Sequence, residues 1–447
     1  MTDLADAVRA VLPGVRADLE ALVRIESVWA DPARHDEVHR SAEAVAELLR
    51  GAGFPEVEIV AEGGAPAVIA HYPPPAGAPT VLLYAHHDVQ PEGDHSLWET
   101  EPFVATQRGD RLYGRGAADD KAGIAAHLAA FRAHGGKPPV GVTVFVEGEE
   151  ESGSPSLSVL LAKYGDRLAC DVIVIADSTN WDIGIPALTV SLRGLADCEV
   201  EVRTLEHAVH SGIWGGVAPD ALTSLARLLA TLHDDDGNVA VAGVTSGTAA
   251  ALDYPEPRVR AESGLLDGVS LIGTGSVVER MWAKPAIAVL GIDCPTATGA
   301  SNTLVPTVTA KVSMRVAPGQ DAAEALDALV KHLESRAPWG AQVTVTRGET
   351  GQPYAIDATG PAYDAARSAF GEAWGTEPVD MGIGGSIPFI GEFHDAFPSA
   401  AILVTGVEDP DTRAHGANEG LHWPEFEKVC LAETLLLAKL AEALTRS

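Results

Sequence analysis

The chain has 447 residues, of which 46% are hydrophobic, and its 31 basic and 63 acidic side chains give a formal net charge of −32. The length predicts two domains, and the apolar content predicts a globular protein rather than a disordered one. The negative charge repels nucleic-acid phosphates and anionic membrane surfaces, so neither is expected as a partner.

The cysteines and the N-terminus bear on cellular location. Four cysteines lie far apart and form no CxxC pair: Cys170, Cys198, Cys294 and Cys430. This spacing favours reduced thiols in a cytoplasmic protein over a disulfide framework. The N-terminus lacks a basic stretch followed by an apolar core, and no apolar run approaches the roughly 18 residues of a membrane span. A signal peptide and a transmembrane helix are therefore not expected.

The first part of the chain alternates between helical and strand patterns. In chain order these predict helices at 4–23 and 37–49, a strand at 80–85, a helix at 121–133, a strand at 142–146, a helix ending at 164 and a strand at 171–176. Apolar residues at helical spacing indicate the helices, and short β-branched runs indicate buried strands. Pro13 and Gly14 should bend or interrupt the first helix. The alternation predicts an α/β fold with a mostly parallel sheet covered by helices.

The pattern changes after about residue 187, where polar and apolar residues alternate as in half-exposed antiparallel strands. Further elements are predicted as strands at 188–202, 308–316, 343–346 and 400–405, and helices at 220–232, 322–335, 362–374 and 426–444. We therefore predict a discontinuous domain formed by residues 1–187 and 353–447. An α+β domain at 188–352 is predicted to be inserted into it.

Acidic and histidine residues stand where the predicted strands end. Four glutamates follow the strand at 142–146: Glu147, Glu149, Glu150 and Glu151. Carboxylates so close together repel one another, so a proton, a cation or solvent should neutralise at least one of them. A solitary acidic run is usually a solvated turn, but His86, Asp119 and Asp177 also lie at or just past strand ends, where parallel sheets bind ligands. A cluster of divalent metal ions would explain all of these residues.

Several motifs together resemble the M20 metallopeptidases, and in particular their dipeptidase and carnosinase-like branch. The motifs are AHHDVQP (85–91), LYGRGAADDKAG (112–123), EGEEESGS (147–154), the strand ending at Asp177, and His415 late in the chain. The resemblance covers nearly the whole chain and implies that the inserted domain is a lid or dimerisation domain. It also implies that His86 and Asp177 hold one metal ion, that Glu151 and His415 hold a second, and that Asp119 bridges both.

The charge balance agrees with two divalent ions. Three ligand carboxylates against two such ions leave one positive charge, which a bridging hydroxide would cancel. Water bound to a metal ion can have a pKa of about 7 and so supply a nucleophile at neutral pH. The mixed nitrogen and oxygen ligands favour Zn²⁺, with Mn²⁺ or Co²⁺ as alternatives.

The same resemblance implies three catalytic residues. Glu150 would be the general base, which takes a proton from the activated water and passes it to the leaving amine. Asp88 would orient the imidazole of His86. His210, in the segment HSGIWGG, would reach the active site of a partner subunit and stabilise the tetrahedral oxyanion. The side chain of His87 should point away from that of His86 and is interpreted as structural.

Substrate-binding residues are implied in the same way. Arg315 matches the position from which relatives clamp the C-terminal carboxylate of the substrate, and Asn302 is a candidate for a contact from the partner subunit. Gly385 and Ser386 lie in GGSIP (384–388), which resembles a loop whose backbone amides bind that carboxylate. The chain has Gly-Ile at 382–383, where carnosinase-like relatives commonly have Arg-Glu, and this departure leaves the dipeptide preference open.

The leading hypothesis is a cytoplasmic homodimer that cleaves the amide bond of dipeptides or similar small peptides with a metal-activated water, and whose lid closes to assemble the site. The alternative within the enzyme class is an N-acyl-amino-acid deacylase or desuccinylase on the same two-metal site. A non-catalytic binding or scaffold protein is a third hypothesis, but such a protein would have no reason to keep the base, the bridge and every ligand. A requirement for a free α-amino group in the substrate would favour the dipeptidase.

Overall fold

The computed structural model describes residues 4–385 and 388–445. The chain divides into two compact units, and unit 1 consists of Met1–Val190, Ile356–Met381 and Phe389–Ser447. Unit 2 consists of Ser191–Ala355 and Gly382–Pro388.

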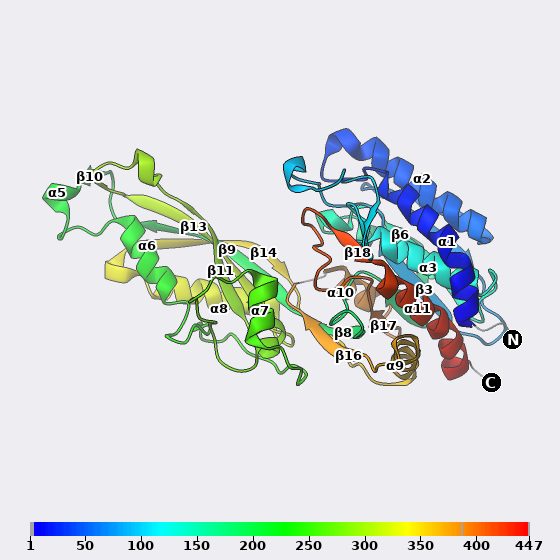
Figure 1. Ribbon diagram of the computed structural model, residues 1–447. Coiled ribbons are helices and arrows are strands. Elements are labelled where there is room, and N and C mark those ends of the chain that lie inside the picture. The colour runs from blue at the N-terminus through cyan, green and yellow to red at the C-terminus, as the bar shows by residue number, and fades with distance from the viewer. Residues whose placement is uncertain (1–3, 386–387, 446–447) are drawn as a thin grey trace. The chain divides into compact units, whose positions relative to one another are not determined.

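Unit 1 contains most of a nine-stranded sheet with the order β1-β2-β6-β3-β7-β17-β8-β15, in which β16 also pairs with β8 (Figure 1). The strands of this sheet are β1 (Glu56–Val60), β2 (Ala67–Tyr72), β3 (Thr80–His86), β6 (Gly141–Glu147), β7 (Val172–Ile175), β8 (Ala187–Leu192), β15 (Tyr354–Ala355), β16 (Val379–Ile383) and β17 (Ala401–Val404). Strand β15 and the last residues of β8 and β16 belong to unit 2. The central strands β6, β3, β7 and β17 are parallel, whereas β1, β2 and β8 pair antiparallel with their neighbours. The predicted α/β fold with a largely parallel central sheet is confirmed.

Helices cover both faces of this sheet, which is why β6 can be buried along its whole length. They are α1 (Leu4–Val23), α2 (His35–Ala52), α3 (Lys121–Ala133), α4 (Leu157–Leu168), α9 (Pro361–Trp374), α10 (Pro388–Ala396) and α11 (Trp423–Leu444). Apolar residues of α1, α3, α9 and α11 share one core with one face of the sheet. On the other face, Phe389 and Phe393 of α10 pack against Tyr84, with ring centroids 4.6 and 5.3 Å apart. None of the helices within 4–385 and 388–445 is long and apolar enough to cross a membrane.

Two sequence expectations need correction. Helix α1 runs through Pro13 without interruption. The single strand predicted at 188–202 is two strands, β8 and β9 (Gly194–Arg203), which belong to different sheets and are separated by Arg193. The break occurs where the backbone packs closely, because a Cβ on Gly194 would lie 2.5 Å from the carbonyl oxygen of Gly351.

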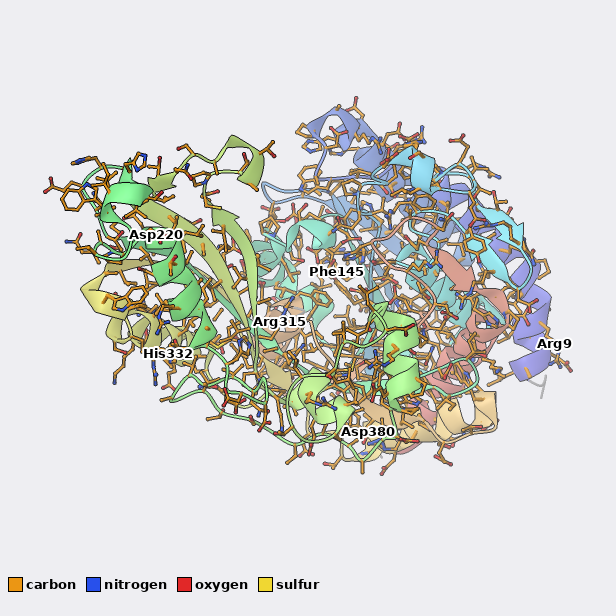
Figure 2. The ribbon with its side chains drawn as sticks, turned by 60° about the vertical axis from the view of Figure 1, so that its left-hand side comes forward. Arg9, Phe145, Asp220, Arg315, His332 and Asp380 are labelled. Atoms are coloured by element: carbon orange, nitrogen blue, oxygen red, sulfur yellow. The ribbon has the colours of Figure 1, made fainter. Side chains whose placement is uncertain are left out.

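Unit 2 contains a four-stranded antiparallel sheet with the order β11-β13-β9-β14. The other strands of this sheet are β11 (Ala286–Asp293), β13 (Thr307–Val316) and β14 (Gln342–Gly351). Strand β13 alternates strictly between half-buried and buried residues, and the buried ones pack against α6 (Ala221–Ala230) and α8 (Ala322–Ser335). Asp220 caps the N-terminus of α6, and His332 lies on α8 (Figure 2).

Smaller elements complete both units. In unit 1, β4 (Thr106–Arg108), β5 (Arg111–Tyr113) and β18 (Gly420–His422) form a three-stranded sheet. In unit 2, β10 (Val209–His210) pairs with β12 (Thr303–Leu304), and two short helices are α5 (Ser211–Trp214) and α7 (Glu256–Ser263).

A buried ion pair joins α3 to α11 in unit 1. The Nδ1 atom of His127 lies 2.8 Å from Oε1 of Glu433, and Nε2 lies 2.9 Å from the carbonyl oxygen of Tyr84. Since both ring nitrogens face acceptors, the doubly protonated ring fits this site best. Burial opposes the charged ring, but Glu433 outweighs that effect, and the pKa of His127 is raised above its ordinary value.

Glu433→Gln is therefore expected to destabilise the protein more at pH 6 than at pH 9. In the wild type, the raised pKa of His127 gives a stabilisation that is complete below the unfolded pKa of about 6.5 and is lost as the pH rises through the folded pKa. Without the carboxylate of Glu433, the buried imidazole of His127 is no longer stabilised in its charged form. Folding at low pH must then remove a proton from His127, and this lowers the free energy of unfolding. The extra loss in the free energy of unfolding at pH 6 should be about 1 kcal/mol or more by denaturant titration. Glu372→Gln is the control, because it removes the carboxylate of a more exposed ion pair, that with Lys439. Equal losses of stability at both pH values for Glu433→Gln would contradict the prediction.

Candidate metal centre

The candidate site lies at the carboxyl ends of three adjacent parallel strands of unit 1. Strand β3 ends at His86, β6 ends three residues before Glu150, and Asp177 follows β7. Because β3 pairs in parallel with both β6 and β7, these ends share one edge of the sheet. The fold therefore brings together residues that are far apart in the chain.

Asp119 lies between two histidines. Its Oδ1 atom is 3.1 Å from Nε2 of His86, and its Oδ2 atom is 3.0 Å from Nε2 of His415. Each imidazole thus faces its own carboxylate oxygen, which is the arrangement expected of a carboxylate that bridges two ions.

Ligand atoms of the described residues converge in two groups. One group is His86, Glu150 and Asp177, and the other is His86, Asp119 and Glu151; within each group, all ligand atoms lie within 4.8 Å of one another. His415 adjoins the second group, because its Nε2 lies 3.3 Å from Oε2 of Glu151. All five predicted ligands and the predicted base Glu150 therefore surround one small region.

The carboxylates of this region crowd one another. Burial, and then the nearby Asp119, raise the pKa of Glu151 to about 8. Burial also raises the pKa of Asp177 to about 6, with a contribution from Asp119 that His86 opposes. The pKa of Glu150 is raised well above its ordinary value by burial and by Asp177. Divalent cations would remove this mutual repulsion, so the set of imidazole and carboxylate donors fits two such ions.

Asp88 supports both halves of the site. Its Oδ1 atom lies 3.4 Å from Nδ1 of His86, and its carbonyl oxygen lies 3.1 Å from the same nitrogen. Its two carboxylate oxygens also accept from the backbone N–H groups of Glu150 and Glu151, each at 3.1 Å. Asp88 thus contacts the imidazole of His86 and also anchors the backbone of the two glutamates, which sequence reasoning did not foresee. Its role toward the metal centre stays a prediction.

Sequence reasoning missed Glu419, a fully buried carboxylate. It accepts from the backbone N–H groups of Gly116, Ala118 and Asp119 at 3.1, 2.9 and 3.1 Å. It also accepts from Nη1 of Arg115 at 2.7 Å, while Nη2 of Arg115 donates to the carbonyl oxygen of Gly416 at 3.1 Å. This pair ties the loop that carries Asp119 to the loop that carries His415. The only sequence signal was a glutamate four residues after that histidine, in the segment GANEG.

Two further features hold the second ligand group. The backbone N–H and the Nε2 atom of Gln90 donate to Oε1 and Oε2 of Glu151, at 3.1 and 2.7 Å. The backbone of His415 has a φ of +61°, a left-handed conformation that is unfavourable for a histidine outside a constrained site. Gln90 lies within the motif AHHDVQP (85–91), but its contact with Glu151 was missed from the sequence, as that of Glu419 was.

Three other residues of the motifs at 85–91 and 147–154 are buried and make structural contacts: His87, Glu147 and Glu149. Nε2 of His87 donates to the carbonyl oxygen of Pro66 at 2.8 Å, and burial lowers the pKa of His87 to about 4. Glu147 accepts from the hydroxyl of Tyr84 at 2.8 Å, and burial raises its pKa to about 8, so it is protonated at neutral pH. Glu149 accepts from the backbone N–H of Ser156 at 2.8 Å. Two of the four glutamates thus shape the loop rather than the metal centre.

In unit 2, the structure places His210 beside Asn302. The backbone N–H of Ser211 donates to the carbonyl oxygen of Asn302 at 2.9 Å, and β10 pairs with β12 next to it. His210 is exposed, and its Nδ1 accepts from the backbone N–H of Gly212 at 3.0 Å. The proton of the neutral ring is therefore on Nε2, where it can be donated to an oxyanion.

The other predicted substrate residues also belong to unit 2. Arg315 is half-buried in β13 (Figure 2), and Gly385 follows β16, while Ser386 lies outside the described residues. A Cβ on Gly382 would lie 2.6 Å from Cβ of Trp282, so close packing requires glycine at this departure from the family pattern. The roles of these residues toward the metal centre of unit 1 stay predictions.

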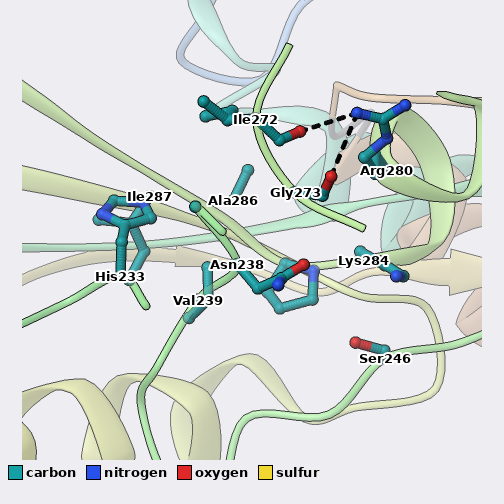
Figure 3. A pocket seen from close by; sticks show the side chains of 12 residues that line it. His233, Asn238, Val239, Ser246, Ile272, Gly273, Arg280, Lys284, Ala286 and Ile287 are labelled. Atoms are coloured by element: carbon teal, nitrogen blue, oxygen red, sulfur yellow. Dashed lines mark hydrogen bonds between the residues drawn. The ribbon is translucent and has the colours of Figure 1, made fainter. Parts of the chain in front are cut away.

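Unit 2 also contains a cavity of about 280 Å³ lined in part by His233, Ile287 and Lys284 (Figure 3). Of the described residues predicted for the site, none lines this cavity. Arg280, at its edge, donates Nη1 to the carbonyl oxygens of Ile272 and Gly273, at 2.8 and 3.4 Å (Figure 3). Arg315 nevertheless lies next to the cavity, because Arg315 pairs with the lining residue Ala286 across β13 and β11.

The chain was compared with known families, proteins and structures. A model of the family described as Peptidase family M20/M25/M40 matches residues 82–442. A cysteinylglycine-S-conjugate dipeptidase from Corynebacterium striatum is 35% identical over 427 residues, covering 94% of this chain and 94% of that protein. A human Beta-Ala-His dipeptidase is 30% identical over 389 residues, covering 81% and 75%. The crystal structure of human carnosine dipeptidase 1 superposes with a TM-score of 0.78 at 26% identity, covering 98% of both chains.

Proposed function

The chain belongs to peptidase family M20/M25/M40, and on that premise we propose that it is a metal-dependent dipeptidase that hydrolyses the amide bond of dipeptides. The proposal is carried by Asp119, which directs one carboxylate oxygen to each of His86 and His415. The dipeptidase names of the relatives support the substrate class.

In this proposal His86 and Asp177 would hold one ion, Glu151 and His415 would hold the other, and both ions would share Asp119. When bound, the two ions supply a nucleophile from water at neutral pH and polarise the scissile carbonyl. The crowding of carboxylates around His86 supports the binding of two cations. Zn²⁺ is the proposed metal. Imidazole and carboxylate donors suit it, and they suit Mn²⁺ and Co²⁺ as alternatives.

Residues of the chain then manage protons and charge. Glu150, whose pKa is raised well above its ordinary value by burial and by Asp177, would accept the proton of the water and give it to the leaving amine. His210 would donate from Nε2 to the oxyanion. Arg315 and the loop that contains Gly385 would bind the C-terminal carboxylate of the dipeptide.

A homodimer, formed through unit 2 so that His210 and Asn302 serve a partner subunit, is part of the proposal. So is a cytoplasmic location, which the four free cysteines support: Cys170, Cys198, Cys294 and Cys430. The relative from Corynebacterium striatum makes an S-conjugate of cysteinylglycine a first substrate to assay.

The test is hydrolysis of a panel by protein reconstituted with Zn²⁺, Mn²⁺ or Co²⁺. The panel contains free dipeptides, the cysteinylglycine S-conjugate, the same dipeptides with an acetylated α-amino group, and N-acyl amino acids. We expect hydrolysis of free dipeptides, loss of activity on acetylation, and two metal ions per chain by elemental analysis. Hydrolysis of only the N-acyl amino acids would show a deacylase instead of a dipeptidase. If the protein bound no metal and hydrolysed none of the compounds, both the dipeptidase and the deacylase would be refuted.

A further inference from the structure

Arg193 stands at the break between β8 and β9 and makes four contacts within unit 2. Its backbone N–H donates to the carbonyl oxygen of Ile383 at 3.2 Å, and its Nε donates to that of Gly384 at 3.2 Å. Its Nη1 lies 3.4 and 3.3 Å from the carbonyl oxygens of Arg280 and Lys284. One side chain thus connects the segment at 382–385 to the segment that precedes β11.

The segment at 382–385 packs closely against other parts of unit 2 at two of its glycines. A Cβ on Gly384 would lie 2.8 Å from Nη2 of Arg193 and 3.2 Å from the carbonyl oxygen of Met281. A Cβ on Gly382 would lie 2.7 Å from Oγ of Ser191. Gly384 therefore lets this backbone approach Arg193 closely, whereas Gly382 lets it approach Ser191 and Trp282.

A second guanidinium, that of Arg315, lies near Arg193. Arg315 pairs with Leu195 across β13 and β9, two residues beyond Arg193. Burial and the charge of Arg315 lower the pKa of Arg193 to about 10, although the side chain stays charged at neutral pH. Among the residues within 4–385 and 388–445, no carboxylate forms a salt bridge with either arginine, so no ion pair offsets the repulsion between their charges.

Two neighbouring cations without a carboxylate are costly in a protein with 63 acidic residues, unless a ligand provides the anion. The carbonyl oxygens around Arg193 satisfy hydrogen bonds but do not neutralise charge. A carboxylate placed at Arg315 would remove the repulsion between the two arginines. The unpaired cations therefore point to an anionic ligand.

We propose that Arg193 is a positioning residue for the substrate carboxylate: it holds the segment at 382–385 next to Arg315 and supplies a second positive charge to that subsite. The inference rests on the proposed function, because it takes the ligand to be the C-terminal carboxylate of a dipeptide. Arg193 reaches backbone carbonyls only and needs no direct contact with the reacting atoms.

Arg193→Gln is expected to raise KM for a free dipeptide by about 10- to 100-fold, as for loss of a charge-assisted interaction. KM for the C-terminal amide of the same dipeptide, which has no carboxylate, should change by less than about twofold, and kcat should change little. Arg193→Lys, which keeps the charge but not the branched set of donors, should raise KM for the dipeptide by about 10-fold. Arg203→Gln, on the exposed end of the same strand, is the matched control and should leave both KM values unchanged.

Equal increases in KM for the dipeptide and its amide would overturn the proposal, because they would assign Arg193 a purely structural role. If Arg193→Gln does not fold, the change in KM of Arg193→Lys for the dipeptide, compared with that for its amide, tests the proposal by the same criterion. Calorimetric binding of glycylsarcosine and of its amide to the full chain separates this proposal from the proposed function. Suppose that the wild type hydrolyses no dipeptide. The carboxylate subsite is still supported if the wild type binds the acid more tightly than the amide and Arg193→Lys removes this preference. Equal binding of the acid and the amide by the wild type overturns the subsite.

Discussion

Glu150→Gln is expected to lower kcat by about 10³-fold while the protein retains two metal ions per chain. Glutamine is nearly isosteric with glutamate but cannot accept and release a proton in the relevant pH range. The backbone N–H of Glu150 is fixed by Asp88, so the substituted side chain should remain in the same place. KM should change little, because the substitution removes a proton carrier rather than a substrate contact.

The measurement combines steady-state kinetics on a dipeptide with elemental analysis of the dialysed protein. Glu101→Gln, an exposed glutamate of unit 1, is the control and should match the wild type in both assays. The structure makes the metal analysis informative, since Glu150 shares a ligand group with His86 and Asp177. If Glu150→Gln lost one of the two ions, Glu150 would be a ligand and not the base. If Glu150→Gln turned over the dipeptide as fast as the wild type does, Glu150 would have neither role.

Glu419→Gln is expected to lower the free energy of unfolding by about 3–5 kcal/mol and metal affinity by about 10- to 100-fold. The change leaves the guanidinium of Arg115 buried without a counter-ion. It also places an amide where the carboxylate accepts from three backbone N–H groups of the loop that carries Asp119. Both the stability of unit 1 and the position of the bridging carboxylate should suffer.

Denaturant titration of the metal-free protein measures the first effect, and competition with a chromogenic chelator measures the second. Glu433→Gln is the matched control, because it also removes one partner of a buried ion pair in unit 1 but leaves the loop at 114–119 untouched. It should lower stability without changing metal affinity. Wild-type metal affinity in Glu419→Gln would show that the loop holds Asp119 without this anchor.

The sequence predicted those parts of the fold that depend on strong local patterns. Helix α8 and strand β13 have a clear periodicity, and they lie where the pattern placed them. The break between β8 and β9 could not be predicted, because Arg193 is held by carbonyl groups nearly 200 residues later in the chain. The edge strand β11 was missed as well, although its sequence AIAVLGID is mostly apolar.

The candidate site divides in the same way. Ligand residue types at strand ends, together with a family resemblance, were enough to nominate His86 and Asp177, because adjacent parallel strands end at one edge. Gln90 and Glu419 act through hydrogen bonds to a ligand or to its backbone, and such contacts leave no periodic trace in the sequence. The second role of Asp88, as an acceptor for the backbone of Glu150 and Glu151, was hidden for the same reason.

The discontinuous course of unit 1 has a consequence for biosynthesis. Strand β17 fills the position between β7 and β8, yet more than 200 residues separate it from either strand in the chain. While the ribosome is still making residues 191–355, the nascent chain therefore exposes an unpaired edge of β7, a segment of the kind that aggregates readily. The anchor Glu419 emerges later still, so the nascent protein should acquire its metal ions only when translation is nearly finished.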